Sequence, residues 1–550
     1  MKQNRKPILM VCVLILLLIL IGGTSFVIKR FMPSKDRVDL NEYYGTLDEN
    51  RAHVILNAKQ ADGQALIADG MVYLPLDFVT SKLNQSFYFD QEGNQILYAS
   101  PGDISNVPVS EEPGGEAFLK DGKLYLQMDY ILRYTNLYTE FLEDPSRIVI
   151  QTKLKDLPCV MTKKETDVRY QGGIKSEILT TVPLGTNLVV IEELDNWIQV
   201  ATLTGFRGYV EKKCVQSADD LTIETGINVE SYQYLTMDQK VNLVWHQVTN
   251  QESNDYFAED TAAMTGVNVI SPTWFSVTDN EGNISSIASQ EYVEQAHARG
   301  LQVWGLIDNF NENVNTAELL SSTTARWNLI SLLVNQALSV GMDGINIDFE
   351  SLNEEAGPHF IQFLRELSVM THKNNLVLSV DDPVPEDFTA HYDRTEQGRV
   401  VDYVIIMGYD EHYVGSEQAG PVASFPWVEK GVQDTLEEVP ADRVINAIPF
   451  YTRLWKVSDG VLTSEAIGMD TALEAVTSRN GEITWDANAG QNYSSFETEE
   501  GTFQIWLEDE QSITAKTLLV PRYGLAGIAA WKLGFENDGI WQVIQNNLNG

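Results

Sequence analysis

From about residue 225 onward, short apolar runs alternate with amphipathic stretches, and this alternation constrains the fold more than any other feature. The apolar runs are nearly continuous, which is typical of strands buried on both faces of a parallel sheet. The stretches between them have helical spacing. The runs begin at Val241, Val267, Leu301, Gly344, Asn375, Val401, Arg443 and Leu525. Eight strand-helix units of this kind predict an α/β fold, a closed parallel (β/α)8 or TIM barrel.

The interval between Trp455 and Gln511 breaks this rhythm. It contains two alternating segments separated by turn-rich text, EITWDANAGQNYSSFETEEGTFQIWLED. A connection of this length with strand patterns of its own is unusual for a simple loop. We therefore predict a small α+β insertion at about 456–512, after the seventh strand, which forms one wall of a groove. The barrel domain as a whole is predicted at 225–550.

The part of the chain before the barrel contains an internal repeat. With 550 residues the chain is too long for one core, and about two to four domains are expected. DGMVYLPLDFV at Asp69 and DGKLYLQMDYI at Asp121 align without gaps, and each copy is read as a turn, a strand, a helix start and a closing strand. Two such units can share a core that neither could bury alone, which predicts an α+β domain at 46–153.

This repeat resembles the small stalk-like domain at the N-terminus of copper amine oxidases. The resemblance implies a spacer or wall-contact role. It implies no copper site, because His53 is the only histidine nearby.

A second small domain is predicted at 158–217. Short apolar alternations punctuated by LGT, LDN and LTG are typical of a five- or six-stranded barrel. The order Val168-Arg169, Gly185, Trp197 and GFRGYV resembles bacterial SH3-like domains. Trp197 is interpreted as a core aromatic, with a ligand platform as the alternative.

The N-terminus is read as a cytoplasmic tail at 1–6, an uncharged apolar run at 7–28 and a linker at 29–45. As a helix, the apolar run reaches roughly 33 Å, which is enough to cross a bilayer core. The run lacks a small-residue cleavage pattern, which favours an uncleaved signal anchor. Basic residues flank both ends, so the positive-inside rule is weakly decisive. We expect a single-pass protein of the cell membrane whose domains face the cell wall.

The charge and the cysteine content limit which binding partners, metals and cofactors are expected. The sequence has 78 acidic and 38 basic residues, a formal net charge of -40, which repels phosphate backbones and excludes nucleic acid as an expected partner. Of the three cysteines, Cys12 lies in the apolar run. No cysteine or histidine spacing indicates a metal site, and no cofactor is expected. A bridge between Cys159 and Cys214 and two unpaired buried thiols both remain open.

The most informative short stretch is GMDGINIDFESL, at 341–352. Side chains at alternate strand positions share a face, so Asn346, Asp348 and Glu350 are expected to point into the barrel. Glu350 then lies at the C-terminal end of its strand, where barrel enzymes perform their chemistry. Two acids held close together away from water retain one proton between them. Glu350 is a candidate general acid, and Asp348 a candidate to orient substrate and stabilise positive charge. Metal ligation and a structural ion-pair network are the alternatives.

The segment DGINIDFE resembles the D-x-x-D-x-D-x-E signature of family 18 glycoside hydrolases, the chitinases and endo-β-N-acetylglucosaminidases. Asp343, Asp348 and Glu350 match, and Gly344 belongs to the same motif. Asn346 departs from the usual aspartate. The departure removes one negative charge, so whether the aspartate relay usual in the family operates here stays an open question. It also predicts a weaker acid dependence of the pH optimum. We interpret the asparagine as the mark of a bacterial wall- and spore-associated subgroup.

Three further segments support the resemblance, which covers about 235–545. MGYD resembles the sixth-strand motif whose tyrosine contacts the acetamido group of the substrate, and PFYTRLW the seventh-strand substrate segment. A tryptophan in GIAAWKLG resembles the aromatic floor of the subsite for the cleaved sugar. The residues implied by these motifs are Met407, Tyr409, Asp410, Tyr451, Arg453 and Trp531. Trp274 and His412 are weaker candidates for the groove.

The resemblance implies a retaining, substrate-assisted mechanism without a protein nucleophile. Glu350 would protonate the leaving oxygen, Asp348 would hold the acetamido N–H and Tyr409 its oxygen. The expected substrate is an N-acetylglucosamine polysaccharide cut at β-1,4 bonds, with peptidoglycan ahead of chitin. The rivals are a lectin-like carbohydrate-binding wall protein and a structural wall tether with a vestigial barrel.

Overall fold

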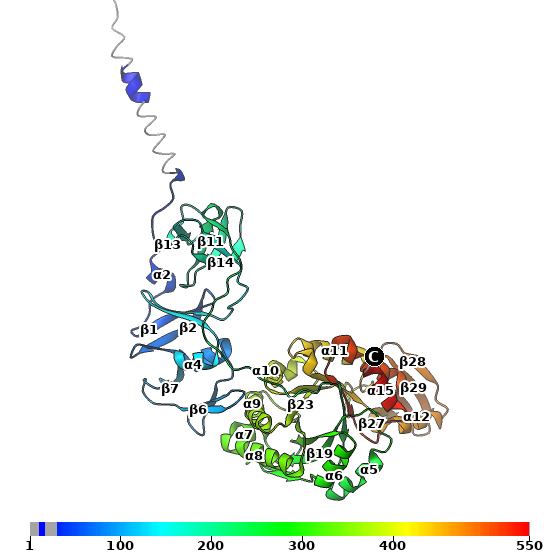
Figure 1. The fold of residues 1–550 in the computed structure, drawn as a ribbon. Helices are drawn as coiled ribbons and strands as arrows, with labels where there is room; N and C mark the ends of the chain where they lie inside the picture. Colours follow the sequence, from blue (N-terminus) through cyan, green and yellow to red (C-terminus); the bar gives the residue numbers. More distant parts are fainter. Residues whose placement is uncertain (1–9, 17–29, 549–550) are drawn as a thin grey trace, which may run out of the picture. The chain divides into compact units, whose positions relative to one another are not determined.

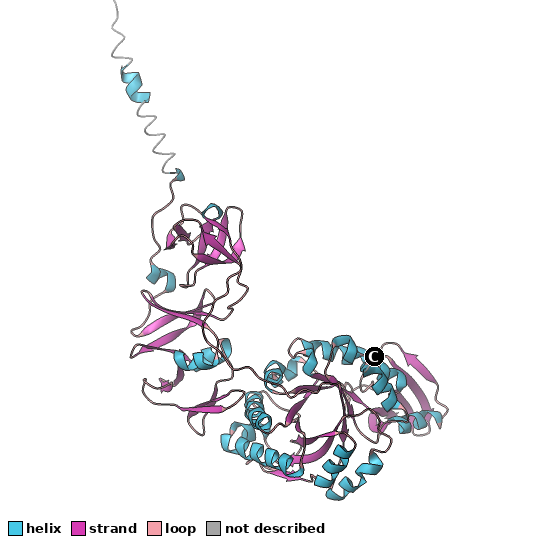
Figure 2. Cartoon of the chain, viewed as in Figure 1, coloured by secondary structure: helices cyan, strands magenta, loops and turns pink. Residues whose placement is uncertain are grey.

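The computed structural model describes residues 10–16 and 30–548, which form two compact units. The first unit contains the residues up to Phe87 together with Val107–Val229. The second contains Tyr88–Asn106 together with the residues from Glu230 onward. Figure 1 follows the chain by sequence colour, and Figure 2 marks the helices and strands of each unit.

The second unit is built around a closed barrel of eight parallel strands, which confirms the predicted TIM barrel. Its strands are β18 (Val241–His246), β19 (Val269–Val277), β21 (Gln302–Asp308), β22 (Gly344–Asp348), β23 (Val377–Pro383), β24 (Tyr403–Met407), β25 (Val444–Pro449) and β31 (Gly527–Trp531). Neighbours in this order pair in parallel, and β31 pairs with β18 to close the barrel. A short strand, β20 (Ile284–Ser286), pairs antiparallel with β19.

Helices follow the barrel strands and surround them (Figure 1). They are α5 (Phe257–Asp260), α6 (Gln290–Ala298), α7 (Thr316–Ser321), α8 (Thr323–Val340), α9 (Gly357–Lys373), α10 (Arg394–Val400), α11 (Phe425–Leu436), α13 (Glu510–Thr517), α14 (Leu519–Tyr523) and α15 (Ile540–Leu548). Short 3-10 turns are η2 (Gln251–Tyr256), η3 (Asp387–Tyr392) and η4 (Ala441–Arg443). Helix α8 shows why such segments have defined ends. The Ser322 hydroxyl accepts the Ala325 N–H at its start, and Gly341 ends it with a φ of 81°.

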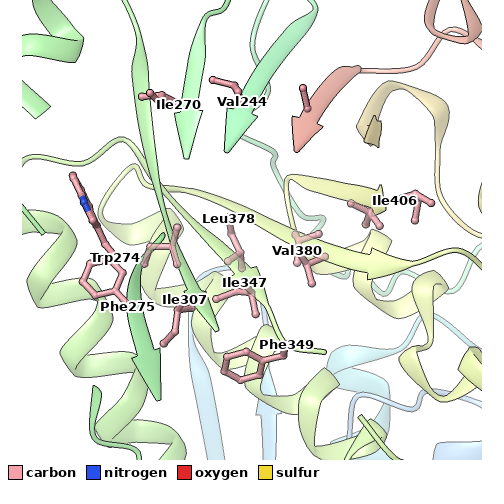
Figure 3. Packing of buried hydrophobic residues seen from close by; sticks show 14 of the residues in the cluster. Val244, Ile270, Trp274, Phe275, Ile307, Ile347, Phe349, Leu378, Val380 and Ile406 are labelled. Carbon is pink, nitrogen blue, oxygen red and sulfur yellow. The ribbon is translucent and has the colours of Figure 1, made fainter. Parts of the chain in front are cut away.

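The core of the barrel unit lies between strands and helices. Alternate residues of β22 and β23, including Ile347, Leu378 and Val380, belong to one large buried apolar cluster together with Phe349, which follows β22 (Figure 3). Each fully buried side chain of this kind contributes about 1.5–3 kcal/mol of transfer free energy. The strands are therefore fixed from outside, and their other face is available for the inward-pointing residues.

The predicted insertion is present as an antiparallel sheet with one helix. Its elements are β26 (Tyr451–Ser458), β27 (Val461–Gly468), α12 (Met469–Thr477), β28 (Ile483–Asp486), β29 (Gln491–Thr498) and β30 (Gly501–Leu507). The sheet order is β27-β26-β30-β29-β28. The segment PFYTRLW is not one barrel strand, because β25 ends at Pro449 and residues from Tyr451 pair antiparallel with β27. The insertion therefore begins before the expected residue 456.

In the first unit, the repeat forms a seven-stranded sheet of order β7-β8-β3-β2-β1-β10-β9. Its elements are β1 (Arg51–Leu56), β2 (Lys59–Ala68), β3 (Met71–Pro75), α3 (Leu76–Lys82), β7 (Ala117–Lys120), β8 (Lys123–Gln127), α4 (Met128–Tyr134), β9 (Tyr138–Glu143) and β10 (Ser146–Gln151). The closing strands of the first copy instead form a separate sheet. These are β4 (Tyr88–Asp90) and β5 (Gln95–Ala99), joined by β6 (Ile104–Pro108). Residues 88–106 of this small sheet belong to the barrel unit.

The other domain of the first unit is also a seven-stranded sheet, rather than one of five or six strands, of order β13-β12-β16-β15-β14-β11-β17. Its elements are β11 (Cys159–Thr162), β12 (Thr166–Arg169), β13 (Ile178–Val182), β14 (Asn187–Glu193), β15 (Trp197–Ala201), β16 (Arg207–Glu211), η1 (Lys212–Cys214) and β17 (Val215–Ser217). Trp197 is half-buried. Cys159 and Cys214 are both buried and unbridged.

The predicted linker contains a short helix, α2 (Leu40–Tyr44). Of the predicted apolar span at 7–28, only residues 10–16 are described, and the rest lies outside the described residues. Within residues 10–16 and 30–548, no helix has the length and apolar character needed to cross a bilayer.

Candidate active site

Strand β22 presents its polar residues to the inside of the barrel, as its alternation predicts. Ile345 and Ile347 pack in the outer apolar cluster, whereas Asn346 and Asp348 point inward. In the pairing of β21 with β22, Asp308 lies opposite Asp348. The strand therefore delivers its side chains to the centre of the barrel at fixed heights.

Asn346 is fully buried, and both ends of its amide have partners. The Trp245 indole N–H and the Ser271 hydroxyl donate to its oxygen over 2.9 and 3.2 Å. Its Nδ2 donates to Ser379 Oγ at 3.0 Å and to Asp381 Oδ1 at 2.8 Å. An ionised aspartate could make neither of these last two donations, and a protonated aspartate could make only one of them. The asparagine thus ties four strands together and supplies a donor to Asp381.

Asp348 is an inward-facing acid whose hydrogen-bonding capacity is not fully used. Its side chain is 6 % exposed, and Oδ1 has no hydrogen-bond partner among the described residues. Burial raises the pKa of Asp348 well above its usual value, and the nearby carboxyls of Asp381, Glu350 and Asp308 raise it further. An acceptor in this state is able to take a hydrogen bond from a ligand.

Glu350 follows directly after β22 and is held through its backbone. Its N–H donates to Asn309 Oδ1 over 2.9 Å, and its carbonyl accepts from Asn309 Nδ2 over 3.0 Å. The residue lines a cleft of about 520 Å³ between the segments 309–317 and 350–356. Burial raises the pKa of Glu350, with further contributions from Asp410 and Asp308. The carboxyl therefore keeps its proton to higher pH than an exposed glutamate.

The segment after β24 adds hydroxyl and carboxyl groups. Tyr451 donates its hydroxyl to Asp410 Oδ1 over 2.6 Å, and its ring meets the Tyr409 ring edge-on at 6.1 Å. Burial raises the pKa of Tyr409 well above its usual value, so its hydroxyl stays a hydrogen-bond donor. Asp410 has a φ of 64°, a left-handed conformation that turns the chain here. Met407 ends β24 and is half-buried.

Trp531 ends β31 and is half-buried beside the inner apolar residues of the barrel. Its ring lies 5.9 Å from that of Trp245, which in turn donates to Asn346. Arg453 lies on β26 of the insertion, where it donates to Ser464 over 3.1 Å. It therefore belongs to the insertion sheet and not to a barrel strand.

Asp343 and Gly344 lie at the other end of β22, away from Glu350. Asp343 accepts the Val303 N–H and pairs with His297, both at 2.8 Å. A Cβ on Gly344 would come within 2.8 Å of the Trp304 ring. These two motif residues shape the strand start.

Two weaker candidates are placed elsewhere. Trp274 is 2 % exposed, donates to Asn254 over 2.8 Å and packs on Tyr292 in the outer cluster, so the expectation that it lines the groove is wrong. His412 forms a hydrogen bond with the Pro421 carbonyl at 2.9 Å.

Sequence reasoning missed Asp308, Asn309 and Asp381. A signal was present, because the predicted strands LQVWGLID and NLVLSVDD both end in aspartate, at the barrel end where active sites form.

Residues 232–536 match the glycosyl hydrolases family 18, and residues 164–216 match the bacterial SH3 domain, which confirms the SH3-like prediction. The first match spans more than half of the chain, and the chain therefore belongs to glycosyl hydrolases family 18. It is a glycosidase of this family, with an additional SH3 domain.

Curated relatives share the barrel region. The chain is 26% identical over 294 residues to the "Uncharacterized glycosylase YvbX" of Bacillus subtilis, covering 51% of this chain and 85% of the relative. It is also 26% identical over 242 residues to the "Cortical fragment-lytic enzyme" of Bacillus subtilis, covering 42% of this chain and 56% of the relative. The chain thus spans little more than half the length of the latter.

Solved structures share the fold. A chitinase from Chromobacterium violaceum matches with a TM-score of 0.51 at 23% identity, over 56% of this chain and 99% of that chain. The spore cortex-lytic enzyme SleL of Bacillus cereus matches with a TM-score of 0.51 at 21% identity, over 60% of this chain and 78% of that chain.

Proposed function

We propose that the protein cleaves β-1,4 bonds that follow N-acetylglucosamine in a wall polysaccharide, with retention of configuration and with assistance from the substrate. One observation carries this proposal. The carboxyl of Glu350, whose pKa is raised, lies near that of Asp348 at the C-terminal end of β22, and Asp348 has an oxygen without a partner among the described residues. A proton donor and a free acceptor side by side fit a substrate that brings its own nucleophile.

In the first step, Glu350 gives its proton to the glycosidic oxygen while the acetamido carbonyl oxygen of the sugar bonds to the anomeric carbon, and the bond between the anomeric carbon and the glycosidic oxygen breaks to release the alcohol. Asp348 accepts the acetamido N–H, and its negative charge stabilises the cationic ring that forms. The Tyr409 hydroxyl donates to the acetamido oxygen, and Trp531 forms an apolar wall. In the second step, the Glu350 carboxylate takes a proton from water while the water oxygen bonds to the anomeric carbon. The bond between the anomeric carbon and the acetamido oxygen breaks, so the acetamido group is regenerated and the original configuration is restored.

The substrate preference for peptidoglycan over chitin rests on two supports. Relatives include enzymes named for lysis of cortical fragments, and an SH3 domain precedes the barrel. A cell-membrane location with the domains facing the wall rests on the sequence at 7–28 alone. The stalk-like reading of the repeat likewise rests on the resemblance of its sequence.

Replacement of Glu350 by glutamine tests the proposal. The amide keeps the size of the side chain but cannot donate an acidic proton, so turnover of an N-acetylglucosamine oligomer is expected to fall by about 10³-fold. Glu354→Gln is the matched control, because this exposed glutamate lies on the same loop outside the cleft lining. The control should turn over like the wild type. Oligomer binding without turnover by the wild type would instead support a lectin-like protein.

A further inference from the structure

Three aspartates lie in a row across neighbouring barrel strands. Asp308 pairs in register with Asp348. On the other side, Asn346 pairs with Ser379 and Ile347 with Val380. One step further along both strands, Asp348 lies beside Asp381, and adjacent strands are about 4.8 Å apart.

Asp381 is almost completely buried and is oriented by Asn346. The Asn346 Nδ2 donates to Oδ1 of Asp381 over 2.8 Å, and the Trp245 indole also acts on this carboxyl as a hydrogen-bond donor. Asp348 Oδ1, in contrast, has no hydrogen-bond partner among the described residues. A proton on the second oxygen of Asp381 would give Asp348 Oδ1 a partner.

The charges around the pair favour such a proton. The titratable groups whose charge acts on it come from β21, from the residue after the end of β22 and from β23. They are Asp308, Glu350 and Asp382, and Tyr409 after β24 also faces the pair but stays neutral. All of these are acids, and in the described part of the chain neither Asp348 nor Asp381 has an ion-pair partner within 4.0 Å. Burial raises the pKa of both carboxyls well above the usual value, so they cannot both ionise at neutral pH.

We propose that Asp381 is a positioning residue that shares one proton with Asp348 across β22 and β23. In the resting enzyme the proton bridges the second Asp381 oxygen and Asp348 Oδ1. When the acetamido N–H of a substrate takes its place at Asp348, the proton stays on Asp381, and Asp348 is the ionised acceptor. No proton is gained or lost by the pair. This inference rests on the proposed function and adds a carboxyl from β23 to it.

The same arrangement gives Asn346 a role. Its oxygen is occupied by donors from Trp245 and Ser271, which turns its N–H groups toward Ser379 and Asp381. The family pattern has a carboxyl at position 346, and here Asp381 on the neighbouring strand β23 provides a carboxyl instead. The pair retains one negative charge beside Glu350.

The test begins with Asp381→Asn in the full chain. Across the acidic limb Asp381 carries the shared proton and is neutral, so the variant removes the acidic O–H that stabilises the ionised Asp348 and puts a weaker amide donor in its place. Asp348 then takes up a proton at higher pH, and the acidic limb of the pH profile of kcat/KM should move to higher pH. Since Asp348 loses its bridging partner, kcat should fall about tenfold or more, with a smaller change in KM. An acidic limb at the wild-type pH would overturn the proposal.

Two further variants keep the test decisive. The exchange Asn346→Asp with Asp381→Asn restores one carboxyl and one amide, and should return the acidic limb toward the wild-type pH. Asp382→Asn is the matched control, because Asp382 is the adjacent buried residue but pairs with Arg394 at 3.5 Å and accepts from Gln397 at 3.0 Å. It should move the acidic limb much less than Asp381→Asn does, even where its unfolding temperature falls. An Asp382→Asn profile shifted like that of Asp381→Asn would contradict the proposal.

A measurement without substrate separates the two claims. Infrared titration of the buried carboxyl protons should show a group that deprotonates at higher pH in the wild type than the carboxyl left in Asp381→Asn or in Asp348→Asn. An unchanged titration of the remaining carboxyl in both variants would overturn the shared proton. If this titration shifts as expected while no variant or wild type cleaves oligomers, the pairing stands and the proposed function fails.

Discussion

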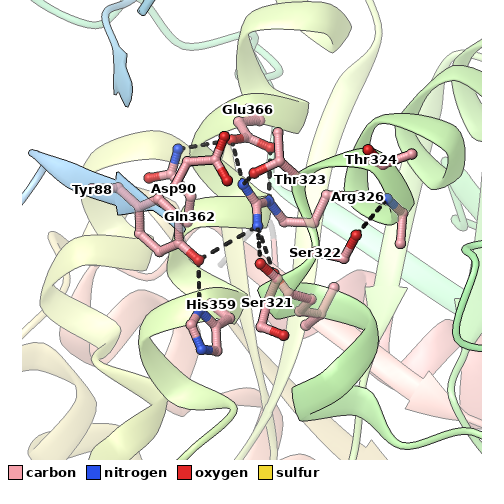
Figure 4. A network of polar contacts seen from close by, with 12 residues as sticks. Tyr88, Asp90, Ser321, Ser322, Thr323, Thr324, Arg326, His359, Gln362 and Glu366 are labelled. Atoms are coloured by element: carbon pink, nitrogen blue, oxygen red, sulfur yellow. Dashed lines mark hydrogen bonds and ion pairs between the residues drawn. The ribbon is translucent and has the colours of Figure 1, made fainter. Parts of the chain in front are cut away.

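Two polar clusters are buried in the barrel unit, and they differ in how their charges are paired. The inner cluster consists of Asn346, Asp348 and Asp381. The outer cluster, drawn in Figure 4, consists of Arg326, Glu366, Gln362, Tyr88 and His359. In the outer cluster, Arg326 binds Glu366 through two hydrogen bonds of 3.0 Å, and its guanidinium lies 5.0 Å from the centre of the Tyr88 ring.

The two clusters show the difference between a buried acid that stabilises the fold and one that is available for chemistry. Glu366 has a cation on both oxygens and a further donor in Gln362 at 2.9 Å. Asp348 has neither among the described residues, and its pKa is raised. A buried acid with complete partners contributes to a single packed state, whereas a buried acid with an unused oxygen is available for substrate.

The largest expected effect is on stability in the outer cluster. Arg326→Met leaves Glu366 buried without its cation and should lower the free energy of unfolding by about 3–5 kcal/mol. Denaturant unfolding followed by tryptophan fluorescence measures this loss. Arg326→Met combined with Glu366→Met removes both charges and should recover most of it. A double variant as unstable as the single one would show that the charges are not coupled as described.

The next effect is on activity in the inner cluster. Asp348→Asn keeps the volume but removes the charge that stabilises the cationic ring, and kcat should fall by about 10²- to 10³-fold, equivalent to roughly 3–4 kcal/mol. The unfolding free energy should change little, because a buried negative charge is removed and the amide can still hydrogen-bond to Asp381. Steady-state kinetics and denaturant unfolding on the same preparation check both halves. A stable variant with wild-type kcat would break the contrast between the clusters.

A smaller effect concerns the pH profile. Asp308 raises the pKa of Glu350, so Asp308→Asn should lower that pKa. Glu350 then loses its proton at lower pH, and the alkaline limb of kcat/KM should move to lower pH by less than about one unit. Ser276→Ala is a useful companion, because it removes the 2.8 Å hydrogen bond to Asp308 but leaves the charge. An alkaline limb that shifts upward in Asp308→Asn would exclude this electrostatic link.

The smallest effect is expected for Tyr88→Phe. The ring remains beneath Arg326, but the hydrogen bond between the Tyr88 hydroxyl and His359 Nδ1, 2.7 Å long, is lost. The cost should be about 1 kcal/mol of unfolding free energy, with kcat unchanged. Thermal unfolding and oligomer turnover measured together check this. Loss of kcat would connect the outer cluster to the site.

Both the barrel and the catalytic strand could be predicted from the sequence, because their information is local. Continuous apolar runs indicate parallel strands. The two-residue period of β22 places Glu350 on the inward face, at the C-terminal end of the strand. The inner cluster could not be predicted in the same way. Asn346 and Asp381 are 35 residues apart, and only the register of β22 and β23 brings them into contact.

The outer cluster was missed for a related reason. The internal repeat places residues 88–106 in the N-terminal domain, yet Tyr88 bonds His359, and Glu92 accepts from Ser322 at 2.9 Å. A repeat reports that two segments share a local fold. It does not report which surface each copy packs against, and here the two copies pack differently.

The central claim is that the sugar's acetamido group supplies the attacking oxygen while Glu350 supplies the proton. The most direct measurement compares initial rates on an N-acetylglucosamine oligomer and on the same oligomer without its acetyl groups. The account predicts cleavage of the first and a rate lower by about 10³-fold or more on the second, because an attacking group held in place is lost. Equal rates on the two oligomers would contradict it.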